Sequence, residues 1–251
     1  MEKKSLYRND INGLRALAVV AVIINHFNKE ILPNGYLGVD MFFVISGYVI
    51  TLSLFDRQSN NILDFLLSFY ERRLRRLLPA LLVFVFTTSL LISFFNSYPP
   101  QSLKTGITSL IGLSNLYLIR YSTDYFANHL DLNPFAHTWS LGVEEQFYFI
   151  FPIIIWFTGF NRGIKNSIRN LALVLLCLSL VSFTSFVYFY QTNQPIAYFS
   201  MFTRFWEMSS GSLLFLVLSK NISFIKFLKN IYPLPILILI LGTFFLPLSA
   251  C

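Results

Sequence analysis

Residues 137–152 read HTWSLGVEEQFYFIFP and place polar and ionisable side chains directly against a strongly apolar run that extends to Phe157. The polar part includes His137, Trp139, Ser140, Glu144 and Glu145. Ionisable groups at the edge of a bilayer are costly, so they usually mark a functional site or a buried polar network. The stretch therefore predicts a membrane helix with a polar site beside it.

The composition of the whole chain agrees with a membrane protein. Of its 251 residues, 55% are hydrophobic and only 12% are charged, whereas a soluble domain carries roughly 25% charged residues. The apolar runs are continuous and do not alternate with polar residues, which favours spanning helices over a barrel. We therefore expect an all-α, polytopic transmembrane bundle that forms one membrane domain over residues 1–251.

Seven apolar segments have the length and composition of membrane spans. They cover residues 12–28, 35–55, 78–96, 146–159, 170–190, 205–219 and 231–250. The run 105–119 is shorter and contains Gly, Ser, Thr and Asn, so its crossing is in question. We expect about seven or eight membrane segments.

The distribution of basic residues predicts the orientation, because Lys and Arg collect in cytoplasmic loops. With the N-terminus inside and 105–119 not fully crossing, 14 of the 19 basic residues lie inside, and six of these move outside if 105–119 crosses. Charge therefore favours a cytoplasmic N-terminus and a re-entrant or interfacial segment at 105–119. Since the basic residues are scattered among apolar spans, the net charge of +7 predicts no nucleic-acid binding. The two cysteines predict neither a disulfide framework nor a metal site.

Four arginines cluster in the sequence ERRLRR, within a stretch 64–78 that we expect to form a helix on the inner membrane surface. They are Arg72, Arg73, Arg75 and Arg76. The first and third, and the second and fourth, are three residues apart, so each pair can converge on one anion. Arginine forks suit phosphate, but charge alone favours a stop-transfer cluster or contact with anionic membrane lipids.

Arg15 and His26 both lie in the first apolar segment. Since an α-helix turns about 100° per residue, their spacing puts them on one face, roughly 16 Å apart along the axis. A shared polar face predicts a common cavity. The alternative is an arginine that reaches the membrane surface and a histidine bonded to a neighbouring helix. Histidine is the side chain best suited to moving a proton near neutral pH.

Asp40 lies in the second apolar segment, in the sequence GYLGVDMFFVISGY. Small residues that allow close helix approach are Gly35, Gly38, Ser46 and Gly47. Because an unpaired carboxylate there would be costly, we expect Asp40 to pair with His26 or Arg15. An aspartate beside His26 would orient the imidazole and raise its basicity, and the alternative is a purely structural ion pair.

The acidic pair in the opening stretch allows two interpretations. One carboxylate faces a cavity, and the other caps the helix predicted at 146–159, since Ser140 followed by Glu144 loosely fits helix-start chemistry. We take Glu144 as the catalytic candidate. For Glu145, His137, Trp139 and Ser140 a structural role is as well supported as contact with substrate.

Five stretches, in this order, resemble the acyltransferase-3 family of bacterial inner-membrane O-acyltransferases. They are YRNDINGLRALAVVAVIINHF, GYLGVDMFFVISGYVIT, FYERRLRRLLPALL, NPFAHTWSLGVEEQFYFIFP and FTRFWEMSSGSLL, and they cover nearly the whole chain. The family's arginine–histidine motif matches Arg15 and His26, and its basic motif matches the four clustered arginines. Its Phe-Phe-x-x-Ser-Gly segment matches Phe42, Phe43, Ser46 and Gly47.

The resemblance implies transfer of an acyl group, often acetyl from cytoplasmic acetyl-CoA, to a carbohydrate hydroxyl. Acceptors of this class include lipopolysaccharide O-antigen, other surface polysaccharides and lipid-linked oligosaccharides. The arginine cluster would then bind the phosphates of the acyl-CoA donor. His26 would be the base or acyl carrier, oriented by Asp40, and Arg15 would bind the thioester or stabilise the oxyanion. No metal is implied.

Family members have more helices than this chain, and many add an extracytoplasmic SGNH hydrolase-like domain. The chain ends inside an apolar stretch, so we expect a C-terminally incomplete domain without an SGNH domain. A partner would supply the missing helices, or the chain is an inactive truncated member. A transporter or flippase for a lipid-linked sugar or acyl donor is the alternative from another class, because buried Arg, His and Asp also suit a translocation path.

Overall fold

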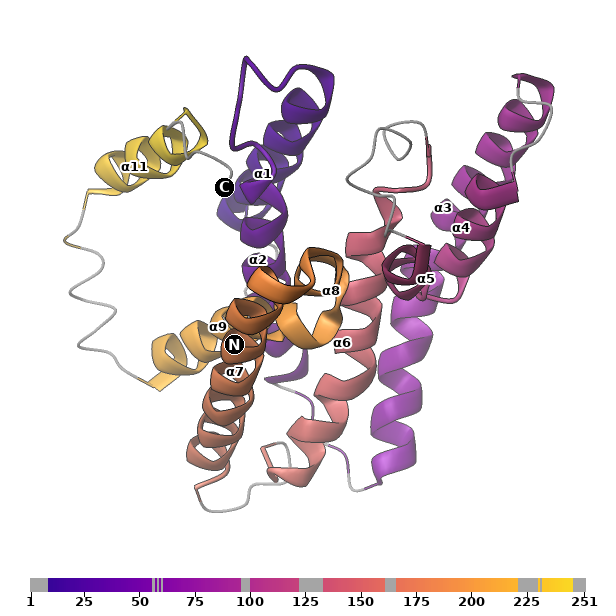
Figure 1. Cartoon of the computed structure of the whole chain (residues 1–251). Coiled ribbons are helices and arrows are strands. Elements are labelled where there is room, and N and C mark those ends of the chain that lie inside the picture. Colours follow the sequence, from indigo (N-terminus) through magenta and orange to yellow (C-terminus); the bar gives the residue numbers. More distant parts are fainter. Residues whose placement is uncertain are drawn as a thin grey trace. The chain divides into compact units, whose positions relative to one another are not determined.

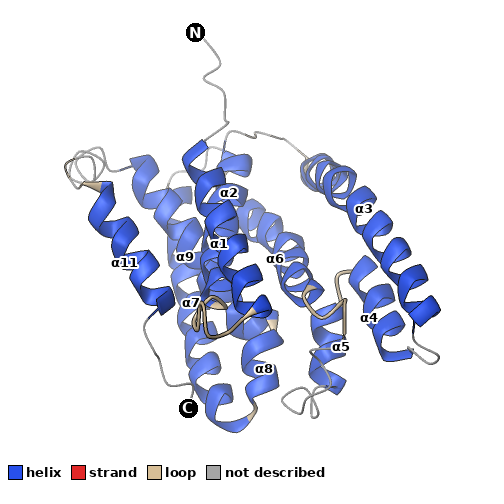
Figure 2. Ribbon diagram, turned by 90° about the horizontal axis from the view of Figure 1, so that it is seen from above, coloured by secondary structure: helices blue, strands red, loops and turns tan. Residues whose placement is uncertain are grey.

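The computed structural model describes residues 9–55, 57, 59, 61–95, 100–121, 133–160, 166–220, 230 and 232–245. Every regular element in these residues is a helix (Figure 2), which confirms the all-α prediction. Five helices are long and apolar enough to cross a membrane: α1 (Asn9–Phe27), α2 (Leu37–Phe55), α3 (Ile62–Phe95), α6 (Thr138–Phe157) and α7 (Ser167–Thr192).

The remaining helices of the described residues are shorter or more polar. They are α4 (Pro100–Leu110), α5 (Ser114–Tyr121), α8 (Gln194–Phe199), α9 (Met201–Lys220) and α11 (Pro233–Phe245). The predicted span 205–219 lies within α9, which the five apolar helices do not include. The short helix α8 was not predicted.

The chain divides into two compact units, and the boundaries fall inside α2 and α9. Unit 1 contains Met1–Thr51 and Glu207–Cys251, and unit 2 contains Leu52–Trp206. Unit 1 therefore holds α1, α11 and most of α2 and α9, while unit 2 holds α3 to α8 (Figure 1). Each unit carries a part of the predicted site.

Close helix crossings hold unit 1 together. A β-carbon on Gly35 or Gly38 would collide with a backbone carbonyl of α1. Gly47 of α2 and Gly211 of α9 are each pressed against a carbonyl of the other helix. The prediction that small residues around Asp40 permit close helix approach is confirmed at these glycines.

Two asparagines connect α1, α2 and α11 within unit 1. The Nδ2 of Asn25 donates to the carbonyls of Leu32 at 2.8 Å and Pro33 at 3.1 Å. The Nδ2 of Asn34 donates to the carbonyl of Thr243 on α11 at 3.0 Å. Helix α11 lies within the predicted span 231–250, of which residues 231 and 246–250 lie outside the described part of the chain.

Helix α3 is a single helix of 34 residues, which corrects the predicted boundary at residue 78 between a surface helix and a span. Its basic half and its apolar half differ so much in composition that they resemble separate segments. Pro79 lies inside α3, where a proline removes one helical hydrogen bond and crowds the preceding turn, yet the helix continues through it. The basic half packs against α6, where the rings of Phe65 and Trp156 lie 5.8 Å apart.

The run 105–119 forms parts of two short helices, α4 and α5, joined by a turn in which Gly112 has φ +68°. They contain 11 and 8 residues. At about 1.5 Å of rise per residue, neither reaches across a hydrocarbon core of roughly 30 Å. This agrees with the expectation that 105–119 does not cross fully. Helix α4 lies beside α3, and α5 beside α6 (Figures 1 and 2).

Helix α6 begins at Thr138, before the predicted span 146–159, so the polar half of the opening stretch is helical. Neither glutamate caps the helix, and this corrects the capping prediction. His137 occupies the N-cap position without a side-chain capping bond, and the Oγ1 of Thr138 donates to the carbonyl of Phe135 at 2.7 Å. The helix can start early because several of its polar side chains find partners on neighbouring elements.

Candidate functional site

Arg15 lies on the face of α1 that contacts α2 in unit 1. Its Nη2 donates to the Oγ of Ser46 at 3.3 Å, and its guanidinium lies 5.3 Å from the centre of the Phe42 ring. Ser46 is only 1% exposed. The Nε of Arg15 is buried without a hydrogen-bond acceptor in the described part of the chain. A buried donor left without an acceptor is costly, so this guanidinium is suited to a further anionic or carbonyl contact.

His26 lies near the other end of α1 and is exposed. Its Nδ1 lies 2.9 Å from the carbonyl of Val22, in the same helix. A proton on Nδ1 would satisfy this contact and leave the lone pair on Nε2, which is the form that a base requires.

The expected pairing of Asp40 with His26 or Arg15 stays a prediction. Asp40 is half-buried, lies in the first turn of α2 and has an interaction partner. The amino end of a helix stabilises a carboxylate through its dipole and free N–H groups. That position helps α2 to accommodate the carboxylate of Asp40.

Three of the four clustered arginines are exposed on α3: Arg72, Arg75 and Arg76. The Nη2 of Arg75 lies 2.6 Å from Oε1 of Glu71, one turn earlier. The Nη2 of Arg72 donates to the Oγ of Ser68 at 3.3 Å. Contacts of this kind on an exposed helix surface are weak, so these guanidinium groups can exchange them for an anion.

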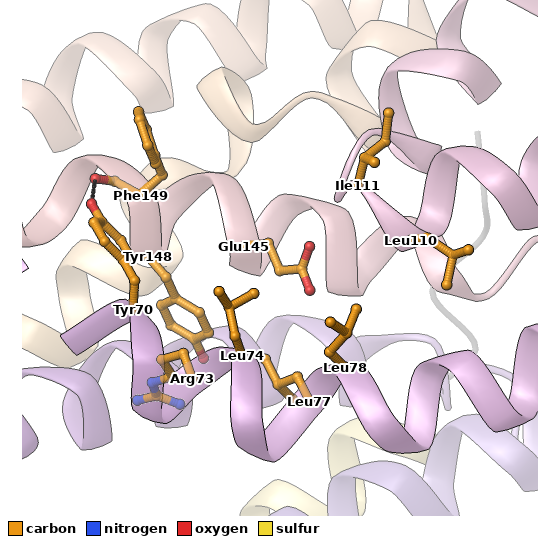
Figure 3. A pocket seen from close by; sticks show the side chains of 10 residues that line it. All are labelled: Tyr70, Arg73, Leu74, Leu77, Leu78, Leu110, Ile111, Glu145, Tyr148 and Phe149. Atoms are coloured by element: carbon orange, nitrogen blue, oxygen red, sulfur yellow. Dashed lines mark hydrogen bonds between the residues drawn. The ribbon is translucent and has the colours of Figure 1, made fainter. Parts of the chain in front are cut away.

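The fourth arginine, Arg73, is half-buried and faces α6. Its guanidinium lies 4.6 Å from the centre of the Tyr148 ring, close enough for a cation–π contact. It also lines a cavity of about 210 Å³ between α3, α6 and the end of α4 (Figure 3). The walls are mostly apolar and consist of Tyr70, Arg73, Leu74, Leu77, Leu78, Leu110, Ile111, Glu145, Tyr148 and Phe149. Ligand pockets usually measure roughly 300–1,000 Å³, so this cavity suits one part of a larger ligand.

The two neighbouring glutamates of α6 have different surroundings. Glu144 is 7% exposed and accepts a hydrogen bond from the hydroxyl of Tyr148 at 3.2 Å. Glu145 is half-buried and lines the cavity, where no residue of the described chain donates to its carboxylate. Gly112 adjoins it, and a β-carbon on that glycine would collide with the carboxylate. Glu145 is therefore the carboxylate that is open to a ligand.

Tyr70 ties α3 to α6 beside the cavity. Its hydroxyl donates to the carbonyl of Phe149 at 2.7 Å, and the two rings stack with centres 5.8 Å apart. Pro152 follows within α6, and a proline leaves a carbonyl of the preceding turn without its helical donor. The carbonyl that Pro152 frees is that of Tyr148, so the Tyr70 bond to the carbonyl of Phe149 joins α3 to α6 beside this gap.

Another face of α6 is held by a closed polar network with α5 and α8. The Nε2 of Gln146 donates to the Oδ1 of Asn115 at 2.7 Å and to the carbonyl of Gly112 at 2.9 Å. The Nδ2 of Asn115 donates to the carbonyl of Phe199 at 3.0 Å. Gly142 permits this approach, because a β-carbon there would lie 2.9 Å from the Oδ1 of Asn115. The network fixes the rotation of α6 and therefore the direction of Glu145.

The other predicted residues at the start of α6 contact protein groups. Trp139 is 6% exposed, and its ring lies 4.7 Å from that of Tyr198. The His137 ring lies 5.3 Å from that of Phe84, and the Oγ of Ser140 donates to the carbonyl of His137 at 3.2 Å. These contacts support a structural role for Trp139.

The sequence did not single out Tyr70, Tyr148, Gly112 or Gln146. Signals for two of them exist: Tyr148 follows Glu144 by one helical turn, and Gly112 lies in the middle of the doubtful run 105–119. Tyr70 and Gln146 acquire their importance only through partners that are distant in the sequence.

Comparisons with known proteins identify the family of this chain. The acyltransferase-3 model, which describes an acyltransferase domain, matches residues 8–250. The O-acetyltransferase OatA of Staphylococcus aureus strain NCTC 8325 is 36% identical over 213 residues, which are 83% of this chain and 34% of OatA. OatA of strain COL gives the same values.

The chain thus spans about a third of the length of these relatives. No solved structure matches it. Because the family model covers almost the entire sequence, and because relatives at 36% identity align over most of it, the chain belongs to the acyltransferase-3 family.

Proposed function

We propose that this chain is the membrane part of an O-acyltransferase that moves an acyl group, acetyl in the first instance, from acyl-CoA to a hydroxyl of a cell-surface glycan. Family membership and the O-acetyltransferase relatives support the reaction class. The observation that carries the proposal is the cavity of unit 2. There Arg73 of the arginine cluster and Glu145 of the opening stretch line the same space.

The arginine cluster supplies the donor site in this proposal. Coenzyme A carries several phosphates, and guanidinium groups bind phosphate through paired hydrogen bonds. Arg72 and Arg76 are exposed on the helix that also presents Arg73 to the cavity. Phosphates held by the exposed arginines would leave the slender remainder of the donor free to enter a space of about 210 Å³.

His26 supplies the base. Its Nε2 would take the proton from the glycan hydroxyl while that oxygen attacks the thioester carbonyl carbon. The tetrahedral intermediate then expels the thiolate of coenzyme A, which receives the proton from His26, and the ester remains on the glycan. The contact of Nδ1 with the carbonyl of Val22 supports this tautomer.

In this proposal Arg15 and His26 contact different groups of the bound substrates. Helix α1 runs without interruption through both residues, so they are roughly 16 Å apart along its axis. Two side chains at that separation cannot both contact one thioester carbon. The buried Nε of Arg15 suits a donor carbonyl or phosphate oxygen instead.

Expression in a bacterial strain that lacks such acyltransferases tests the proposal. Surface glycans analysed by mass spectrometry should carry added acyl groups that mild base removes, since esters are base-labile. A strain that expresses Staphylococcus aureus OatA controls for the presence of an acceptor. Glycans without added acyl groups, although this chain is inserted and the control strain acetylates, would reject the activity of the chain. Labelled acyl groups that cross the membrane without attachment would favour the transporter instead.

His26→Ala should abolish the added acyl groups while the protein still inserts, because the base is lost. The matched control is Asn28→Ala, which removes a polar side chain one residue beyond the end of α1 and should leave acylation unchanged. Acylation by the His26 variant at the level of the control would reject the assigned role.

A further inference from the structure

We propose that Glu145 binds the pantetheine arm of acyl-CoA through a hydrogen bond and so fixes the direction in which the donor lies in the cavity. The inference rests on the proposed function, which assigns acyl-CoA as the donor. It makes Glu145 a donor-binding residue, whereas the sequence favoured its neighbour Glu144 as the reactive carboxylate.

The first argument is the unsatisfied carboxylate. Glu145 is half-buried among leucines of α3, and no group in the described part of the chain donates to it. A buried acceptor without a donor is costly, and more so when it is charged. Glu144 differs, because the hydroxyl of Tyr148 already donates to it. A ligand with an O–H or N–H group would remove the cost at Glu145.

The second argument is the space that the backbone provides for this carboxylate. Gly112, with φ +68°, forms the turn between α4 and α5 directly against Glu145. A β-carbon there would collide with the carboxylate. Gln146, the next residue of α6, bonds the carbonyl of the same glycine at 2.9 Å. The turn is thus fastened to α6 in a position that leaves room for the acid and directs it into the cavity.

The third argument is the order of groups along the cavity. Figure 3 shows Arg73 near one end, Leu110 and Ile111 near the other, and the carboxyl group of Glu145 between them. The pantetheine arm of acyl-CoA has a matching order, with phosphate at one end, a hydroxyl and two amide N–H groups in the middle, and the acyl thioester at the far end. Phosphate at Arg73 and an O–H or N–H at Glu145 would place the acyl group toward Ile111.

Binding of acetyl-CoA to the purified, detergent-solubilised protein tests the inference. Glu145→Leu should weaken binding at least about tenfold, which corresponds to one hydrogen bond to a charged group. Glu145→Gln retains an acceptor oxygen and should lose less. Asp64→Asn removes an exposed carboxylate from the first turn of α3, outside the cavity lining, and should bind as the wild type does. Size-exclusion chromatography confirms that the variants are folded.

Labelling by dicyclohexylcarbodiimide gives a second readout that does not depend on activity. This apolar reagent attaches to carboxyl groups in apolar surroundings, so mass spectrometry should find it on Glu145 and not on Asp64. Acetyl-CoA should protect Glu145 from the label, and vesicles of phosphatidylglycerol should not.

The outcomes separate the two proposals. Loss of affinity in Glu145→Leu together with protection by acetyl-CoA supports the inference. Unchanged affinity, or labelling that acetyl-CoA does not reduce, overturns the inference and leaves the proposed function standing. A wild-type protein that binds no acetyl-CoA overturns both. Protection by phosphatidylglycerol alone overturns the inference by making the cavity a lipid site.

Discussion

The polar side chains on two faces of α6 differ in whether they have hydrogen-bond partners. Toward α5, Gln146 and Asn115 bond each other and nearby carbonyls, and Gly142 lets the two helices approach closely. Toward α3, Glu145 lies in a mostly apolar cavity without a donor from the described residues. Buried polar groups cost free energy unless they are hydrogen-bonded. The first face therefore serves the fold, and the second keeps an acceptor for a ligand.

The largest expected effect is at the close approach of α5 and α6. Gly142→Leu would place side-chain atoms where the Oδ1 of Asn115 lies, since even a β-carbon would come within 2.9 Å. Overpacking of this kind should destabilise the protein by about 3 kcal/mol, measured as the unfolding midpoint in an SDS titration. Gly13→Leu is the control, because a β-carbon there meets nothing within 4 Å. Equal midpoints for the two variants would show that this face is not closely packed.

The next effect is loss of the polar network itself. Gln146→Leu removes the donor to both the Oδ1 of Asn115 and the carbonyl of Gly112, which should cost about 2 kcal/mol in the same titration. Asn115→Leu alone should reduce stability by a similar amount. The double variant should lose less stability than the sum of the two single losses, because the two residues share one network. Strictly additive losses would show that the two side chains act independently.

A smaller effect is expected where Tyr70 supports α6. Tyr70→Phe keeps the stacked ring and removes only the bond to the carbonyl of Phe149, so it should cost about 1 kcal/mol. Tyr188→Phe removes a hydroxyl from an exposed ring on α7 and should cost nothing measurable. A stable Tyr70 variant would mean that stacking alone joins α3 to α6 here.

The sequence predicted the apolar helices well and the limits of the polar ones poorly. The segments 12–28, 35–55 and 170–190 correspond closely to α1, α2 and α7. A helix that is apolar over its whole length appears in the sequence as one continuous hydrophobic run, so its limits can be predicted. The early start of α6 escaped this reasoning. Hydropathy counts Glu144 and Glu145 as unfavourable in a membrane helix and so placed the start after them, whereas the structure continues the helix through both and supplies the hydroxyl of Tyr148 as a donor to Glu144.

The site was predicted at the level of residue types and only partly at the level of contacts. Motif spacing put Arg15 and His26 on one helix and drew attention to both glutamates, as the structure has them. The choice between Glu144 and Glu145 depends on the rotation of α6. That rotation is set by the network with α5 and by the turn at Gly112, so neighbouring positions in the sequence could not reveal it.

The smallest change in stability, and the sharpest test of the comparison, is expected for Glu145→Leu. Leucine suits a cavity already lined by Leu74, Leu77 and Leu78, and the substitution removes a half-buried carboxylate that lacks a donor in the described chain. The variant should therefore be as stable as the wild type, or more stable by up to about 1 kcal/mol.

Gln146→Leu, one position further along the same helix, makes the same change from a polar to an apolar side chain and should have the opposite sign. A loss of stability in Glu145→Leu that matches the Gln146 variant would mean that the carboxylate serves the fold, and the distinction between the two faces would fail. A Glu145→Leu variant that is stable but does not bind acetyl-CoA would instead show that this carboxylate serves ligand binding. The closed network on the other face of α6 would then offset the free-energy cost of leaving the carboxylate without a donor.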